Sequence, residues 1–557
     1  MAPIHRPGEP GTDLVIAAAH VWTGSGAAAD RGADAVGISG GRIAGVGRLA
    51  DVRARLRRGA PVMEVPGGLI LPGFQDAHCH PSHGGYHLIR CDLHEIHGAD
   101  AAVEAVRAYA EAHPDLPWIL GGGWYMADYP GGTPSRHLLD VAVPDRPVLL
   151  VNRDGHGAWV NSCALEMLGI DRSTLDPPFG RIEREADGAP QGTLHEEALG
   201  VARRRLPPET EDERDRGLRA GIAYLHTRGI TALQDAWVEP GDLAAYLRLV
   251  ASGRLTARVR ASLWWDRNAG LEQIEGLRER RSAGTTGRLA AGSVKIMADG
   301  VLENLTGALL EPYLGPDGTA TTERGISFLE PGLLAEAVRL LDADGFQVHV
   351  HAIGDRAVRD ALDAFAAAIR ANGRGGNRHH IAHLQLVHPA DIRRFAELDV
   401  TATMQPFWAC HDAQMDELTI PILGAERAGR QYPFASLHRT GARLAGGSDW
   451  AVSTPDVLRE VQVAVTRTFP APDVRPEPFL PDEALDVDTA LRAFTSGSAY
   501  VNHLDDETGT IEAGRLADLV VVDRDIRAVD PATLLDGRVV LTLVEGEPVH
   551  AAEGVRW

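Results

Sequence analysis

Short apolar runs typical of β-strands alternate with longer alanine- and leucine-rich segments of helical periodicity through most of this 557-residue chain. Alternation of this kind predicts a parallel sheet, because parallel strands need a crossover connection that is usually a helix. The number of runs favours a closed (β/α)8 TIM barrel, an α/β fold, over an open sheet. The candidate strands are PVLLVNRDGH, GITALQDAW, ARVRASLWW, GSVKIMADG, FQVHVHAIGD, RHHIAHLQL, VTATMQPF and ARLAGGSDW.

The two ends of the chain have a different pattern, in which short apolar runs are separated by glycine-containing turns. Examples are DLVIAAAHVWTG and PVMEVPGGLILPG near the start and GRLADLVVVDRD near the end. We expect residues 1–70 and 501–557 to form a small composite β-sandwich domain beside a barrel of residues 71–500. The stretch from 93 to 200 is long for one strand-to-strand connection, so we predict an insertion that forms a lid or wall.

Charge and composition exclude several classes of protein. The formal net charge is -22 and no long basic run interrupts it, so we expect no nucleic-acid partner. No segment reaches about 18 uninterrupted apolar residues, and the N-terminal apolar stretch is too short for a standard signal peptide. The four cysteines lack C-x-x-C spacing and are expected to be reduced. We therefore expect a cytoplasmic protein without a membrane partner.

Polar side chains follow the strand-like runs at their C-terminal ends. In a (β/α)8 barrel these ends face one mouth, so residues far apart in the sequence converge there. The residues in such positions are His78, His80, Asp154, His156, Asp235, Asp299, Asp355, His383, Gln405 and Asp449.

The motif His78-Cys79-His80 directly follows a buried-looking strand. Residues i and i+2 of an extended segment share a face, so both imidazoles could bind one metal ion while Cys79 points away. The alternative is a pair of histidines on the surface or satisfied within the core.

Two further segments offer histidines. In FQVHVHAIGD, His351 lies nearer the end of the strand than His349, so we favour His351 as a metal ligand and a structural role for His349. In RHHIAHLQL, His383 comes late in the apolar run and is the histidine placed to face the mouth.

Asp449 and Lys295 complete the candidate ligands. Asp449 follows a glycine pair at the end of a strand, although an aspartate there could also cap the next helix. Lys295 stands inside an apolar strand, where burial favours the neutral amine. Such an amine could react with carbon dioxide to form a carbamate that bridges two cations; the alternative is an ion pair with Asp299 or another carboxylate.

Together these segments resemble the amidohydrolase superfamily, and within it the YtcJ-like branch that includes N-substituted formamide deformylases. The resemblance covers nearly the whole chain. It is carried by LPGFQDAHCH, VNRDGHGAWVNSCAL, VKIMADG, HVHAIGDRAV, HIAHLQLV, GGSDWAVS and TGTIEAGRLADLVVVD. One departure is HHIAHLQ, where the commoner family pattern is arginine-isoleucine-glutamate-histidine, and this change leaves His383 in place.

The resemblance implies a division of roles. His78 and His80 would bind a buried metal ion with Asp449, and carboxylated Lys295 would bridge it to a second ion held by His351 and His383. One or two divalent ions are expected, with zinc favoured because histidine nitrogens and carboxylate oxygens suit it.

The implied reaction is hydrolysis of a non-peptide carbon–nitrogen bond, of amide or formamide type, through metal-activated hydroxide. Asp449, Lys295 and His383 would be the catalytic residues, and Asp449 would pass the proton of the water to the leaving nitrogen. We expect a small-molecule amide substrate and a homodimer.

Other polar and aromatic residues are candidates for substrate binding. Asp154, His156 and Asn161 could orient the substrate, although Asp154 could instead stabilise a turn. Trp124 and Trp408, with Tyr125, could wall an apolar pocket, although tryptophans more often belong to a core. Glu303 is a further candidate contact.

Two other functions remain open at this stage. A desolvated Lys295 could act as a Schiff-base nucleophile in a lyase, a reading that the series of histidines disfavours. A non-catalytic binding protein on the same fold would require a vestigial metal site.

Overall fold

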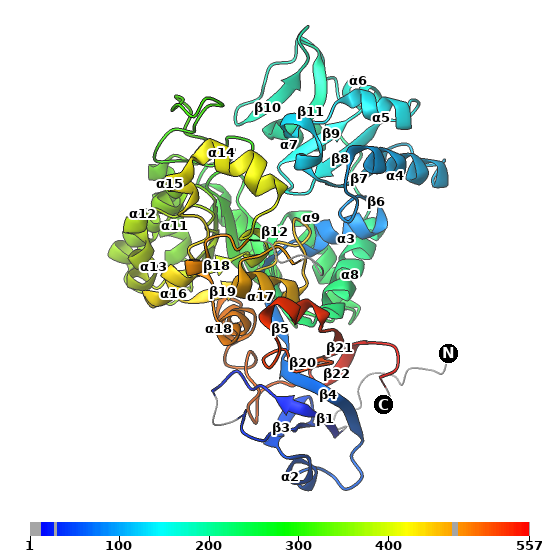
Figure 1. Cartoon of the computed structure of the whole chain (residues 1–557), viewed down its shortest axis with the longest axis vertical. Coiled ribbons are helices and arrows are strands. Elements are labelled where there is room, and N and C mark those ends of the chain that lie inside the picture. Colours follow the sequence, from blue (N-terminus) through cyan, green and yellow to red (C-terminus); the bar gives the residue numbers. More distant parts are fainter. Residues whose placement is uncertain (1–12, 27–29, 471–476, 556–557) are drawn as a thin grey trace.

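A parallel barrel occupies the centre of the molecule, and two further sheets lie on opposite sides of it (Figure 1). The computed structural model describes residues 13–26, 30–470 and 477–555. Neighbouring barrel strands are parallel in the order β5-β12-β13-β15-β16-β17-β18-β19. Their bounds are Phe74–Cys79, Ile230–Val238, Arg258–Trp264, Leu289–Met297, Gln347–Ala352, His380–His383, Thr401–Met404 and Leu444–Gly446. The predicted (β/α)8 barrel is confirmed.

The ends of β19 and β5 meet where the barrel closes. The backbone N–H of Asp449 donates to the carbonyl of His78 at 2.7 Å. A Cβ atom on Gly447 would lie 2.7 Å from the Cβ of His78, so a side chain at this position would collide with the neighbouring strand. The glycine therefore permits the approach that brings the two strand ends together.

One predicted barrel strand is wrong. The run PVLLVNRDGH forms β8 (Val148–Asn152) in the sheet outside the barrel, and β5 takes the remaining barrel position. A strand buried on both faces has the same apolar pattern in either sheet, so the run alone could not separate them.

The side chains of strand β16 alternate between the apolar core outside the barrel and the polar interior of the barrel. All of its residues are buried, as expected for a parallel strand covered on both sides. Val348 and Val350 belong to the apolar core shared with the surrounding helices, whereas His349 and Gln347 bond to polar groups of other strands. The polar half of the alternation thus lines the barrel interior and leads up to the mouth.

Helices follow the barrel strands and cover the barrel from outside. Helix α12 (Asp355–Asn372) buries apolar residues at helical spacing, among them Val358, Leu362 and Phe365, and ends before Gly373, whose φ is 82°. The others are α3 (Pro81–Ile89), α8 (Glu211–Thr227), α9 (Pro240–Ala251), α10 (Gln273–Ala283), α11 (Pro331–Ala343), α13 (Ile392–Leu398), α14 (Ile420–Leu423), α15 (Ala425–Ala428), α16 (Phe434–Arg439), α17 (Val457–Thr466), α18 (Val487–Arg492) and α19 (Ser498–Val501).

A six-stranded sheet lies between β5 and β12 in the sequence, within the stretch where we predict an insertion. Figure 1 shows it on one side of the barrel. Its strands are β6 (Cys91–Asp92), β7 (Ile119–Trp124), β8, β9 (Gly157–Val160), β10 (Gly180–Arg184) and β11 (Pro190–Glu196). Its helices are α4 (Ala99–Ala112), α5 (Arg136–Ala142), α6 (Ser162–Met167) and α7 (Glu197–Arg203).

Strands from both chain ends pair in one seven-stranded sheet, in the order β22-β21-β20-β4-β1-β2-β3. Strand β20 runs antiparallel to β4, which leads directly into β5 of the barrel. The hydrogen bonding describes a single sheet, so the two packed sheets of a sandwich are not shown, and the domain boundaries stay predictions. The bounds are Leu14–Val21, Ala35–Ser39, Arg42–Gly47 and Val62–Pro72 for β1 to β4, Leu519–Val522, Val539–Val544 and Glu547–Ala551 for β20 to β22, and Leu49–Ala54 for α2.

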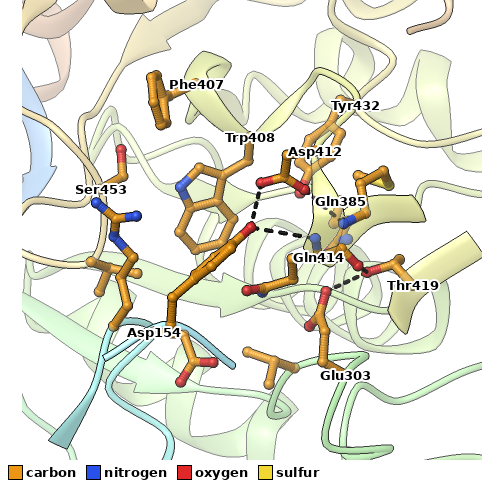
Figure 2. Close-up of a pocket in the computed structure, with 15 residues that line it drawn as sticks. Asp154, Glu303, Gln385, Phe407, Trp408, Asp412, Gln414, Thr419, Tyr432 and Ser453 are labelled. Carbon is orange, nitrogen blue, oxygen red and sulfur yellow. Dashed lines mark hydrogen bonds between the residues drawn. The ribbon is translucent and has the colours of Figure 1, made fainter. Parts of the chain in front are cut away.

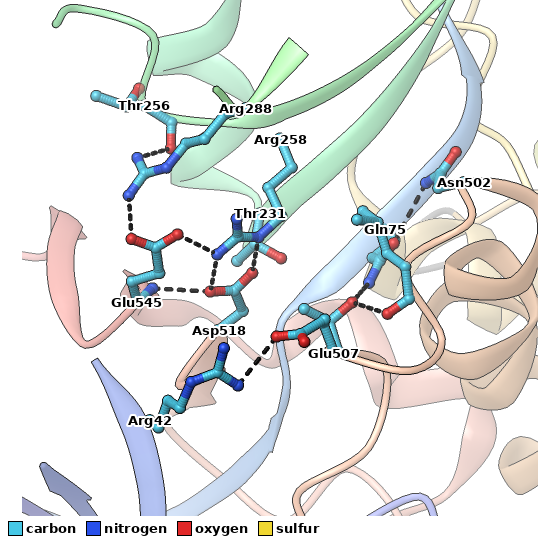
Figure 3. A network of polar contacts seen from close by, with 12 residues as sticks. Arg42, Gln75, Thr231, Thr256, Arg258, Arg288, Asn502, Glu507, Asp518 and Glu545 are labelled. Carbon is cyan, nitrogen blue, oxygen red and sulfur yellow. Dashed lines mark hydrogen bonds and ion pairs between the residues drawn. The ribbon is translucent and has the colours of Figure 1, made fainter. Parts of the chain in front are cut away.

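A buried ion-pair network joins this sheet to the barrel (Figure 3). Arg258, at the start of β13, donates to Asp518 at 2.7 Å and to Glu545 at 2.7 Å. Arg288 reaches the other oxygen of Glu545 at 2.9 Å. Arg258 is 8% exposed and Asp518 is 4% exposed, so water cannot replace these contacts.

We expect Arg258→Met to lower the free energy of unfolding by about 3–5 kcal/mol, because it leaves the buried Asp518 without its counter-charge. Chemical denaturation measures the effect. The matched control is Arg42→Met, which breaks an exposed ion pair with Glu507 (Figure 3) and should change stability by less than about 1 kcal/mol. Equal losses in the two variants would contradict a stabilising role for the buried network.

Among the described residues, no helix combines the length and the apolar character needed to cross a bilayer.

Candidate metal centre

Five predicted ligands lie together at the mouth of the barrel, at or beyond the ends of four strands. The Nε2 atoms of His78 and His80 lie 3.2 Å and 3.0 Å from Oδ1 of Asp449. The Nζ atom of Lys295 lies 3.4 Å from Nε2 of His78. On the other side, Nδ1 of His383 lies 3.8 Å from Oδ2 of Asp449.

His351 lies beside this cluster and not inside it. Its ring centroid is 4.4 Å from that of His383, and its Nε2 is 3.4 Å from the carbonyl oxygen of Gly300. His351 is therefore next to the point where the other ligand atoms converge.

The donor set fits a divalent metal ion. Ligand atoms of His78, His383 and Asp449 all lie within 4.8 Å of one another. The buried Nδ1 atom of His383 has no hydrogen-bond partner among the described residues. Burial lowers the pKa of His383 and of His78 well below the usual range, which keeps the imidazole lone pairs available.

Lys295 is buried in the same cluster. Burial lowers its pKa to about 7, so much of the side chain is the neutral amine near neutral pH. The alternative that we considered was an ion pair of Lys295 with Asp299 or another carboxylate, and the described residues include none within 4.0 Å of its amine. Asp299 instead accepts backbone N–H groups of Ala308, Ile353 and Gly354 at 2.8 to 3.0 Å.

The backbone at two of the ligands is in the left-handed region. The φ angle is 78° at His383 and 55° at Asp449, values that non-glycine residues rarely adopt. Residues held in this way cluster at functional sites, because the surrounding structure must offset the strain.

Asp76 links the strand ends that carry His78 and Asp449. Its Oδ1 accepts the backbone N–H groups of His78 at 3.0 Å and Ser448 at 3.1 Å, and its Oδ2 accepts the hydroxyl of Ser448 at 2.5 Å. We did not single out Asp76 from the sequence, although it stands two residues before His78 on the same strand face.

His349 holds the ring of His78. Its Nε2 is 2.8 Å from Nδ1 of His78, and its Nδ1 is 3.2 Å from the hydroxyl oxygen of Ser262. With the proton of His78 on Nδ1, Nε2 keeps its lone pair facing the cluster. His349 is therefore a positioning residue for a candidate ligand.

We expect His349→Phe to weaken metal affinity by about 10- to 100-fold, because Nδ1 of His78 loses its partner. Competition with a chelator of known affinity measures this effect. His349→Gln keeps an acceptor near His78 and should recover part of the affinity. Unchanged affinity in His349→Phe would contradict the positioning role.

A cavity opens next to the cluster, between the inserted sheet and the loops of the barrel mouth (Figure 2). The empty space is about 680 Å³, including the part open to solvent. Trp408 lines it and lies nearly parallel to the ring of His383, with centroids 6.0 Å apart. Val452, another lining residue, donates its backbone N–H to the carbonyl of Asp449 at 2.7 Å. A ligand in the cavity would thus be next to the candidate metal centre.

Comparison with known proteins agrees with this geometry. The sequence pattern of the amidohydrolase family matches residues 62–550. The chain belongs to the amidohydrolase family. The chain is 30% identical over 528 residues to the putative amidohydrolase YtcJ of Bacillus subtilis (strain 168), a match that covers 93% of this chain and 96% of that protein.

Two more comparisons extend over almost the whole chain. The chain is 27% identical over 555 residues to an N-substituted formamide deformylase of Arthrobacter pascens, covering 96% of this chain and 97% of that protein. An uncharacterized metal-dependent hydrolase from Pyrococcus furiosus shares the fold with a TM-score of 0.70 and 27% identity, covering 92% of this chain and 99% of that one. The chain is thus a hydrolase of a metal-dependent family, and neither the lyase nor the binding protein is favoured.

Of the predicted substrate-binding residues, Asp154, Glu303 and Trp408 line the cavity. Tyr125 also lines it, and the hydroxyl of Tyr125 donates to Asp412 at 2.8 Å. Asp412 stands in a loop segment without a recognisable motif, so the sequence offered no signal for it.

Two of the predicted substrate contacts, Trp124 and Asn161, do not line the cavity. Trp124 is 1% exposed and packs in the core of the inserted sheet, where its indole N–H donates to the carbonyl of Leu150. Asn161 is fully buried, and its amide binds backbone groups of Val143 and Ala164, among others. Both side chains form hydrogen bonds within the insertion and do not line the cavity.

His156 lies next to His351, with ring centroids 5.6 Å apart. Its Nδ1 is 3.0 Å from the buried carboxylate of Glu196, which also accepts the hydroxyl of Thr306 at 2.7 Å. Although burial acts against the charged ring, the Glu196 carboxylate raises the pKa of His156 to about 9. A pKa in this range favours the protonated ring of His156 beside the candidate metal centre. Glu196 follows no motif, and we did not predict its role.

Proposed function

We propose that this protein hydrolyses the non-peptide carbon–nitrogen bond of a small amide, with a formamide-type substrate as the first candidate. The observation that carries the proposal is the convergence of three imidazoles, one amine and one carboxylate beside a cavity lined by polar and aromatic side chains. The likeness to an N-substituted formamide deformylase over 555 residues supports the choice of bond.

The metal would be held by His78, His80, His383 and Asp449, with His351 available for a second ion. Zinc is the first candidate because nitrogen and carboxylate ligands suit it. A divalent ion in this position makes a water molecule more acidic and draws electron density from a substrate carbonyl.

Asp449 would move the proton in this reaction. Its carboxylate would accept a proton from the attacking water and donate it to the leaving nitrogen. The imidazolium of His156, held by Glu196, would orient the carbonyl oxygen or another electron-rich group of the substrate.

Lys295 would become a ligand by reaction with carbon dioxide. The neutral amine nitrogen bonds to the carbon of carbon dioxide and loses one proton, which gives a carbamate with two oxygens. These oxygens would bridge two ions, as the family resemblance implies.

We expect Lys295→Ala to bind about one metal ion fewer per chain and to lower kcat by at least about 10²-fold, since one bridging ligand is lost. Elemental analysis and steady-state kinetics measure the two effects. Recovery of activity with added short carboxylic acids would support the carbamate. A variant with full metal content and wild-type kcat would rule it out.

The reaction class is tested with metal-loaded protein and a panel of N-formyl amines, N-acetyl amines and esters that share the same remaining groups. Release of free amine from the formyl or acetyl compounds is the expected result. Turnover of the esters alone would overturn the proposed bond type.

The cytoplasmic location and the homodimer remain proposals from the sequence.

A further inference from the structure

The cavity beside the metal centre is lined by acidic groups from three separate segments (Figure 2). Asp154 follows β8 of the insertion, Glu303 follows β15, and Asp412 follows β18. In Figure 2, Asp154 and Glu303 face Trp408 and Asp412 across the cavity. Parts of the chain that are distant in sequence therefore place negative charge around one space.

These carboxylates are hydrogen-bonded by neutral donors. Glu303 accepts the hydroxyl of Thr419. Asp412 accepts the hydroxyl of Tyr125 at 2.8 Å and the backbone N–H of Met415 at 2.7 Å. Asp154 accepts the backbone N–H of His156 at 2.8 Å. These neutral donors fix the carboxyl groups in place, and the opposing positive charges come from His156 beside Asp154 and from Arg153 near Asp412.

Arg153 is the only lysine or arginine among the residues that line the cavity. Its guanidinium lies over the ring of Tyr125 at 5.8 Å and donates to the backbone carbonyl of His94 at 3.0 Å. In the described part of the chain it forms no ion pair with the lining carboxylates. Three acidic groups thus line the cavity with one cation, Arg153, and His156 beside Asp154 is the other group that opposes their charge.

The pKa values of these carboxyl groups are raised. Burial raises the pKa of Glu303, and the neighbouring charges of Asp154 and Asp412 raise it further. Burial also raises the pKa of Asp412 and of Asp154. A positive group in the cavity would act in the opposite direction and favour the ionised carboxylates.

Aromatic rings complete the cavity wall. Tyr125, Trp408, Phe407 and Tyr432 line it together with the carboxylates. The face of an aromatic ring attracts a cation, and most strongly where water is excluded. Acidic groups combined with aromatic faces are suited to an ammonium group better than to an anion or a neutral alkyl group.

We propose that the cavity selects amides whose nitrogen substituent carries a positive charge, such as an alkylammonium or quaternary ammonium group. The charged end lies among Asp154, Glu303 and Asp412, against Trp408, while the amide reaches the metal centre next to His383. This inference rests on the proposed function, because it assigns the substituent of an amide that the same site would cleave.

Binding is tested separately from turnover with two probes of nearly equal shape. The probes are 4-(trimethylammonio)benzyl alcohol, a permanent cation, and neutral 4-tert-butylbenzyl alcohol. Calorimetry on the metal-loaded protein should show the cation binding about tenfold more tightly. A third probe, 4-(hydroxymethyl)benzoate, examines Arg153 as an anion site. Equal affinity for the first two probes, or tighter binding of the benzoate, would overturn the inference.

Turnover is tested with the two matching N-benzylformamides, which carry the trimethylammonio or the tert-butyl group. The wild-type protein should favour the cationic compound about tenfold in kcat/KM. In Glu303→Gln and Asp412→Asn this ratio should fall to about threefold or less, because each removes one negative charge from the cavity. The matched control Glu417→Gln removes an exposed carboxylate from the same helical segment as Thr419 and should keep the wild-type ratio.

The two arms separate failure of the specificity from failure of the reaction. Preferential binding of the cation without hydrolysis of either formamide would uphold the cationic site and refute the proposed reaction. Hydrolysis of both formamides with equal kcat/KM would uphold the reaction and refute the cationic site.

Discussion

Asp449→Asn should lower kcat by about 10³-fold or more while the protein remains folded, because asparagine cannot accept the proton of the attacking water. It also removes the carboxylate whose Oδ1 lies 3.2 Å from Nε2 of His78 and 3.0 Å from Nε2 of His80. Steady-state kinetics with an amide substrate measure the loss, and elemental analysis shows how much of it comes from metal occupancy.

Asp235→Asn is the matched control for this variant. Asp235 is also a buried carboxyl group of the barrel, on β12, but it binds the hydroxyl of Tyr246 at 2.8 Å and the backbone N–H of Trp237 at 3.0 Å. We expect its effect on kcat to stay below about tenfold. If Asp449→Asn retained kcat within tenfold of the wild type, the proton-transfer role would be refuted.

Removal of the metal should abolish turnover. Dialysis against a strong chelator should reduce kcat by at least about 10³-fold, because the several kcal/mol of transition-state stabilisation from the ion are lost. Addition of zinc, manganese or cobalt should restore activity to different degrees. Circular dichroism of the stripped protein should remain that of a folded chain, since the barrel core does not depend on the ion.

Metal binding should also be visible without a substrate. An ion that binds only the folded state at 1,000 times its dissociation constant adds about 4 kcal/mol to stability, so the melting temperature should rise with metal concentration. Full activity in protein that elemental analysis shows to be metal-free would refute the assigned centre.

The metal centre could be predicted from the sequence because its geometry follows from strand periodicity. His78 and His80 share one face of a strand, and His383 and Asp449 stand at strand ends that a barrel brings to one mouth. These relations depend on the backbone alone. The position of Lys295 in this cluster could be predicted for the same reason, since an amine inside an apolar strand must face the barrel interior or a partner.

The substrate residues were harder to predict because their roles depend on partners in other segments. Asn161 lies in the same motif as Asp154, yet its side-chain amide forms hydrogen bonds with backbone groups of the insertion. Trp124 precedes Tyr125 by one residue and points into the core, while Tyr125 lines the cavity. Asp412 reaches the cavity through a loop whose path no local pattern determines.

The pairing of β20 with β4 has a consequence for how the chain is made. Strand β4 ends at Pro72, and its partner begins only at Leu519. At a synthesis rate of about 5–20 residues per second, a growing chain on the ribosome would keep this apolar strand edge open for on the order of 20 to 90 seconds. Because an open edge can pair with another chain, a lower expression level, which reduces the concentration of growing chains, should increase the yield of native protein.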